Sequence, residues 1–62
     1  MKRKDLERWL RKHGAARERS GSKHDVWHHD GVEATVPRHK EIKTHTGRAI
    51  CEQLGVPEPP WR

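Results

Sequence analysis

Two stretches of the chain repeat their apolar residues with the period of an amphipathic helix. In residues 3–13 the positions i, i+3, i+4 and i+7 are occupied by Leu6, Trp9, Leu10 and His13. In residues 44–54 the same spacing joins Gly47, Ile50, Cys51 and Leu54. A glycine follows each stretch, and glycine is the commonest residue just past a helix end. The pattern therefore predicts a helix near each end of the chain, the second beginning at Thr44 as N-cap. Gly47 inside this helix suggests that another group packs closely against it.

The middle of the chain predicts a β-hairpin. Residues 23–29 and 32–36 are rich in residues that favour strands, and apolar and polar residues alternate through the second stretch. Asp30-Gly31 between them is typical of a two-residue type I′ turn, in which both positions take positive φ. Pro37 should end the pairing because proline has no N–H to donate.

Residues 15–20 are ambiguous, since their Ala and Arg favour a helix but a helix has just ended; a short strand is the alternative. The expected order is then helix, up to three antiparallel strands, helix. This is an α+β domain over residues 1–56, with two helices on one face of a small sheet and the other face open. Residues 57–62 are proline-rich and should form an extended tail, whose Trp61 could dock on the domain or on a partner.

The composition of the chain is clearly basic. The chain has 62 residues, enough for one domain, and 14 Lys and Arg against 9 Asp and Glu give a net charge of +5. This balance favours RNA or DNA as a partner, although a charged, soluble surface would look the same. No apolar run approaches the roughly 20 residues that cross a bilayer, and the basic N-terminus lacks a signal-peptide core. A single cysteine fits a reducing compartment, so we expect a cytoplasmic protein without membrane partners.

The segment "GSKHDVWHHDG" holds three of the six histidines and raises the question of a metal site. On a strand, His24 and His28 would stand roughly 13 Å apart at about 3.3 Å per residue, too far to share one zinc ion. The chain has no CxxC, no HExxH and no run of carboxylates. We therefore expect no metal or other cofactor, and Cys51, on the apolar stripe of its helix, should be a buried hydrophobe rather than a nucleophile.

Acid–base chemistry by a histidine is the remaining kind of catalysis to consider. RNA carries its own nucleophile, the 2′-OH, so its cleavage needs a proton-transfer group near neutrality and cations that stabilise charge on the phosphate. His24 beside Lys23 supplies both, and Gly21 would let the backbone approach a phosphate. A solvated strand histidine is the plainer alternative. A second basic group follows the hairpin, where a loop carries Arg38, His39 and Lys40; it could hold RNA or simply face water.

Taken together, the segments resemble the HicA toxins of bacterial and archaeal toxin–antitoxin pairs. The matching pieces, in family order over nearly all of residues 4–55, are the first helix closed by "KHG", then "GSKHDVWHHDG", "VPRHKEI" and "RAICEQLG". The resemblance implies a double-stranded-RNA-binding-like fold and a metal-independent mRNA endonuclease neutralised by a HicB antitoxin. It implies that the catalytic histidine is His24 and that the RNA-binding surface includes Lys23, Arg38, His39 and Lys40.

The sequence leaves several questions open. The same fold could be a non-catalytic RNA-binding module or, as a third hypothesis, a zinc-dependent interaction domain. The second proton-transfer partner could be His28, His29 or a water, and Asp25 could orient a cation or face solvent. By strand parity His24 shares a face with His28, opposite Asp25, but the pattern does not say which of these two faces the helices cover.

Overall fold

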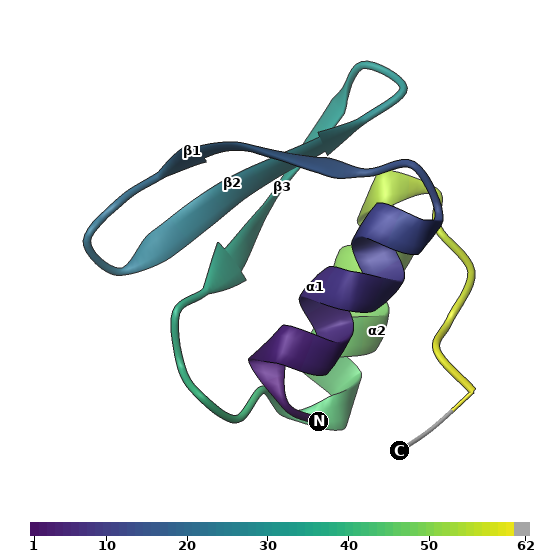
Figure 1. Cartoon of the computed structure of the whole chain (residues 1–62). Coiled ribbons are helices and arrows are strands. Elements are labelled where there is room, and N and C mark those ends of the chain that lie inside the picture. The colour runs from purple at the N-terminus through teal and green to yellow at the C-terminus, as the bar shows by residue number, and fades with distance from the viewer. Residues whose placement is uncertain (61–62) are drawn as a thin grey trace.

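A computed structural model describes residues 1–60 of the chain, so the prediction for Trp61 lies outside the described residues (Figure 1). The elements are α1 (Arg3–Lys12), β1 (Ala16–Ser20), β2 (His24–His29), β3 (Val32–Pro37) and α2 (Thr44–Leu54). Each predicted helix and strand is present within about one residue of its expected bounds. The ambiguous stretch 15–20 forms a strand.

The three strands form an antiparallel sheet in the order β1-β2-β3, with α1 and α2 together on one side of it. The two helices run in the same direction, and their starts are joined where Ile42 N–H donates to the Met1 carbonyl at 2.7 Å (Figure 1). This α-β-β-β-α arrangement confirms the expected α+β fold of the double-stranded-RNA-binding type. The sheet keeps one face free of helices.

The β2–β3 turn has the expected type I′ backbone. Asp30 has φ 49° and Gly31 has φ 79°, and the flanking residues His29 and Val32 pair with each other. Pro37 is the last residue of β3 and pairs with His24, so the pairing ends where proline was expected to end it. Of the predicted apolar face of the second strand, Ala34 and Val36 are buried, whereas Val32 beside the turn is exposed.

The helix ends agree with prediction at their C-termini and differ at one N-terminus. Both helices stop beside glycines with positive φ, Gly14 at 92° and Gly55 at 71°. The expectation that Thr44 caps α2 is wrong, because Thr44 is the first helical residue and Lys43 occupies the N-cap without a side-chain hydrogen bond. A backbone bridge pairs Lys2 with Glu41 shortly before this helix begins.

We expect Gly31→Ala to destabilise the domain by about 1–2 kcal/mol, the cost of a side chain in the left-handed region. No atom lies within 4 Å of the position its Cβ would take, so the effect isolates backbone strain. Urea denaturation followed by circular dichroism measures it. Asp30→Asn is the matched control, since asparagine also tolerates this conformation, and it should change stability little.

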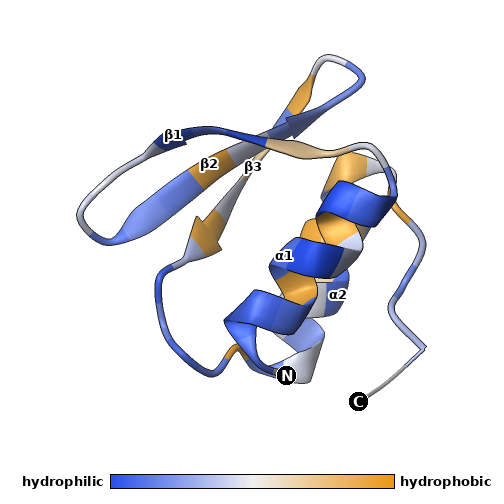
Figure 2. Cartoon of the chain, in the orientation of Figure 1, coloured by the Kyte–Doolittle hydropathy of each residue, from blue (hydrophilic) through white to orange (hydrophobic). Residues whose placement is uncertain are grey.

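The core lies between the two helices and one face of the sheet. Its fully buried side chains are led by Trp27, Leu6, Leu10, Leu54, Val36 and Cys51. Figure 2 shows the apolar colour on the inner sides of the helices and at alternate points of the strands. Gly47 faces Met1, whose sulphur would stand 2.6 Å from an added Cβ, which confirms the close packing expected there.

β1 is an edge strand whose residues are all exposed. Its charged run is suited to an edge, because charges there discourage pairing with another chain. A β-bulge interrupts its pairing with β2: Arg17 lies opposite Trp27, whereas Arg19 lies opposite Val26. The two arginines therefore belong to opposite faces of the sheet, although they are two residues apart.

The described part of the tail packs against the helices. The Trp9 Nε1–H donates to the Pro57 carbonyl at 2.7 Å, Arg48 lies 3.5 Å from the Glu58 carboxylate, and Pro59 is buried. Among residues 1–60, neither helix has the length and apolar character needed to cross a bilayer.

Candidate functional site

The structure decides which way His24 points. Asp25 and Trp27 are 1% and 0% exposed and face the helices, whereas His24 and His28 are exposed. Because side chains alternate along a strand, His24 lies on the open face of the sheet. A large substrate can therefore reach the imidazole without any movement of the helices.

A tight turn at residues 21–23 leads into His24. The Gly21 N–H donates to the His24 carbonyl at 2.8 Å, and a Cβ on Gly21 would lie 2.8 Å from the same oxygen. Contacts that short do not occur for real Cβ atoms, so the turn in this form requires glycine. Lys23 is exposed on the turn and directly precedes the histidine.

The loop after β3 returns to this turn. The Arg38 N–H donates to the Lys23 carbonyl at 3.1 Å, and the Arg38 Nη1 donates to the Gly21 carbonyl at 2.9 Å. The structure thus brings together Lys23, His24 and Arg38, three of the five residues predicted for the site. His39 and Lys40 are exposed further along the loop.

Lys40 belongs to a second cationic group beside the start of α1. The Arg3 N–H donates to the Lys40 carbonyl at 3.0 Å, and a hollow of the surface there is lined by Lys2, Arg3, Lys4, Lys40 and Glu41. The predicted basic surface therefore extends onto N-terminal residues whose positive charge was visible in sequence but whose position was not.

The neighbouring histidines have different surroundings. His29 is half-buried on the helix-facing side, and its Nδ1–H donates to the Leu54 carbonyl at 2.7 Å. It points away from the face of His24 and cannot share a proton transfer with it. His28 is on the open face but four residues along the strand, roughly 13 Å away.

One cation on the open face was missed in the sequence. Arg19 lies opposite Val26 and so shares the open face with His24, and its Nη1 donates to the Glu18 carboxylate at 3.3 Å. Simple alternation would have given Arg17 and Arg19 the same face. Only the bulge at Glu18 separates them, and no turn residue in "ARERS" signals it.

The comparisons with known proteins give one result. The family model described as the HicA toxin of bacterial toxin–antitoxin systems matches residues 3–56. The chain belongs to the HicA toxin family. This confirms the resemblance drawn from the motifs, to a family of toxins from toxin–antitoxin systems. No curated protein and no solved structure matches it.

In this HicA chain Cys51 is fully buried, as predicted. Burial raises the pKa of its thiol above the ordinary 9.0, and the nearby Glu58 carboxylate adds to the shift. The pKa of the Cys51 thiol is higher in the folded state than in the unfolded chain. The contribution of the protonated thiol to the free energy of unfolding is therefore complete below pH 9 and is lost as the pH rises beyond it. The thiol is thus shielded and protonated near neutrality, unlike a catalytic nucleophile.

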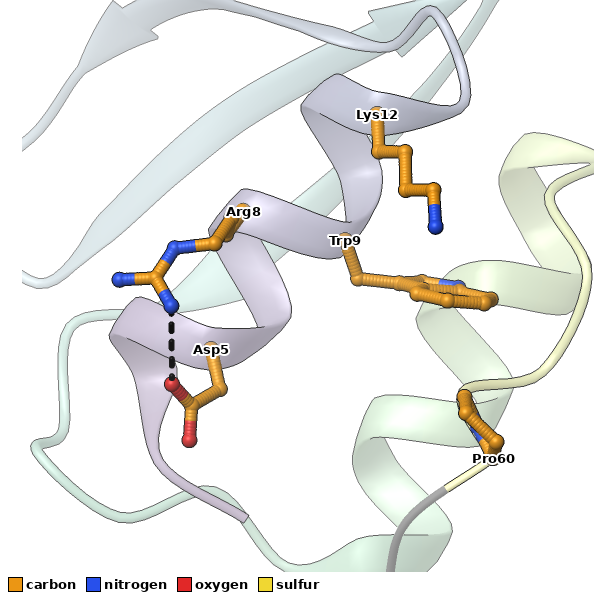
Figure 3. A pocket seen from close by; sticks show the side chains of 5 residues that line it. All are labelled: Asp5, Arg8, Trp9, Lys12 and Pro60. Carbon is orange, nitrogen blue, oxygen red and sulfur yellow. Dashed lines mark ion pairs between the residues drawn. The ribbon is translucent and has the colours of Figure 1, made fainter.

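Three hollows open on the surface of residues 1–60. The first is lined by Asp5, Arg8, Trp9, Lys12 and Pro60, between α1 and the tail (Figure 3). Another, lined in part by His39, opens beside the start of α2. None of the three hollows includes His24, which instead stands on an open surface suited to a polymer. Within residues 1–60, no three His, Cys, Asp or Glu side chains gather closely enough to hold a metal ion.

Proposed function

We propose that this HicA toxin is a metal-independent endoribonuclease that cleaves mRNA with His24 as its acid–base group. The observation that supports this most is the exposure of His24 on the helix-free face, beside a turn that carries Lys23 and is bonded to Arg38. The neighbouring cations Arg19, His39 and Lys40 would extend the phosphate-binding surface around it.

The chemistry follows from the RNA itself. His24 would remove the proton of a 2′-OH, which attacks the adjacent phosphorus, or would protonate the leaving 5′-oxygen. Lys23 would stabilise the negative charge that develops on the phosphate, and Arg38 would contribute positive charge from the rim of the sheet, where its guanidinium lies between Asp25 and the Gly21 carbonyl. The second proton transfer would use water, since His29 faces the core and His28 lies too far along the strand.

The direct test is incubation of the purified chain with mRNA in excess EDTA, with product lengths read by primer extension. Cleavage that persists in EDTA is the expected result. Binding without cleavage would show a non-catalytic RNA-binding module instead, and cleavage or folding that EDTA abolishes would show a metal-dependent domain.

The cations should contribute affinity rather than chemistry. We expect Lys23→Ala and Lys40→Ala each to weaken RNA binding and to lower the slope of log K against log salt by about 0.7, the value for one contact to a single strand. Fluorescence anisotropy at several salt concentrations measures this slope. Lys12→Ala, in the last turn of α1, is the control and should leave the slope unchanged.

Family membership implies an antitoxin, and we propose that it is a HicB-like protein that forms an inhibited complex with this chain in the cytoplasm, where mRNA is translated. The cationic, open site suits a partner that covers it with acidic or neutral groups. Co-expression with the product of the adjacent gene should yield a stable complex without RNA cleavage. Failure of that product to bind or inhibit would remove the assignment.

A further inference from the structure

A carboxylate lies buried directly beneath the proposed site. Asp25 is 1% exposed and points to the helix-facing side of β2, the side opposite His24. Its Oδ2 is 3.7 Å from Arg17 Nη1, and its Oδ1 is 3.7 Å from Arg38 Nε. A buried carboxylate is costly unless it is neutralised, and here two guanidinium groups flank it. Such an arrangement is unexpected on a strand whose other inward residues are Trp27 and the half-buried His29.

Arg38 connects this carboxylate to the turn that precedes His24. The guanidinium lies beside Asp25 and donates to the Gly21 carbonyl at 2.9 Å, while the Arg38 backbone N–H donates to the Lys23 carbonyl at 3.1 Å. Its own carbonyl accepts a hydrogen bond from Arg3 Nη1 at 2.7 Å, which ties the loop to α1. The turn is therefore held at both of its ends by one residue.

We propose that Asp25 and Arg38 form a clamp that positions His24 for catalysis. Asp25 orients the Arg38 guanidinium, Arg38 holds the turn at residues 21–23, and the turn is bonded to the His24 carbonyl. Asp25 is a positioning residue, because its side chain is on the far side of the strand from any RNA bound over His24. The proposal rests on the proposed role of His24 and gives Arg38 a function besides phosphate contact.

The chemistry of the clamp requires these residue types. A guanidinium presents several N–H groups in a fixed plane, so one group can face Asp25 and the Gly21 carbonyl at once, which a single ammonium cannot do in the same geometry. The two carboxylate oxygens of Asp25 each face a different arginine. The β-bulge supplies the second one by turning Arg17 toward the inner face.

The test compares Asp25→Asn and Arg38→Lys with matched controls at exposed positions, Asp30→Asn and Arg8→Lys. Amide hydrogen exchange, without RNA, should be at least about tenfold faster for Gly21 and Arg38 in the two clamp variants and unchanged for Leu10 and Cys51. RNA cleavage should show kcat lower by about 10- to 100-fold with KM within about threefold, because the imidazole is less well placed. The controls should match the parent in both measurements.

Two results would overturn the clamp: unchanged exchange of the turn amides, or a higher KM with the parent kcat, which would make Arg38 a phosphate contact only. Asp25→Asn removes one negative charge, so weaker attraction to RNA cannot explain a lower rate. If that variant does not fold, Arg38→Lys decides the matter, because it keeps the charge opposite Asp25. A parent chain that cuts no RNA would refute the proposed nuclease, whereas exchange still reports separately on the clamp.

Discussion

Replacing His24 with alanine should slow RNA cleavage by about 10²- to 10⁴-fold, the range that a positioned acid–base group contributes. The fold should be unaffected, because the imidazole is exposed on the helix-free face and contributes nothing to the core. RNA affinity should change little, since the surrounding cations remain. Single-turnover cleavage of a defined mRNA, with binding measured separately, shows whether rate and affinity respond differently.

His28→Ala is the matched control for this experiment. His28 is an exposed histidine on the same strand and the same face, so the substitution removes the same group roughly 13 Å away. It should cleave RNA at nearly the parent rate. If His24→Ala cuts RNA as fast as the parent, or if both variants lose activity equally, His24 is not the catalytic group.

Trp27→Ala should unfold the domain. Trp27 is 0% exposed and is the largest fully buried side chain, with the Arg11 guanidinium 5.1 Å from its ring centre. Removing a buried tryptophan costs about 3–5 kcal/mol. At about 0.05–0.15 kcal/mol per residue, a chain of 62 residues has only about 3–9 kcal/mol of stability. Circular dichroism during urea titration should show a strongly reduced or absent folding transition.

Val26→Ala tests whether the loss of stability in Trp27→Ala comes from the burial of Trp27 or would follow from truncating any residue of β2. Val26 is the neighbouring residue on the open face and is only partly buried. Its truncation should cost clearly less, about 1 kcal/mol or under. Equal destabilisation by the two variants would mean that the helix-facing side is not the core.

The proposed clamp links these two faces of β2. His24 points to solvent while Asp25 and Trp27 point to the helices, so a single strand carries the proposed acid–base group, its proposed support and the largest buried side chain of the core. The ion pairs of Asp25 lie where the core ends, and there they can act on the turn before His24.

Much of the fold could be predicted because its signals are local. The apolar stripes of residues 3–13 and 44–54 follow the helix period, and Asp30-Gly31 specifies a turn from two adjacent residues. The cap of α2 was predicted wrongly, because Thr44 is already the first helical residue and the extended Lys43 occupies the N-cap. β1 could not be predicted with the same clarity, since an exposed edge strand has no apolar face to reveal its period.

The sequence by itself determined the two helices, the β2–β3 hairpin, their order, the alternation of His24 with Asp25, and the motifs of the HicA family. Only the tertiary structure decided which side of that alternation faces solvent, which arginine of β1 turns inward, and that Arg38 returns to the turn at Gly21. The physical reason is that a strand's alternation is a property of its own backbone. The choice of face depends instead on where both helices pack, and that is settled jointly by residues distant in the chain.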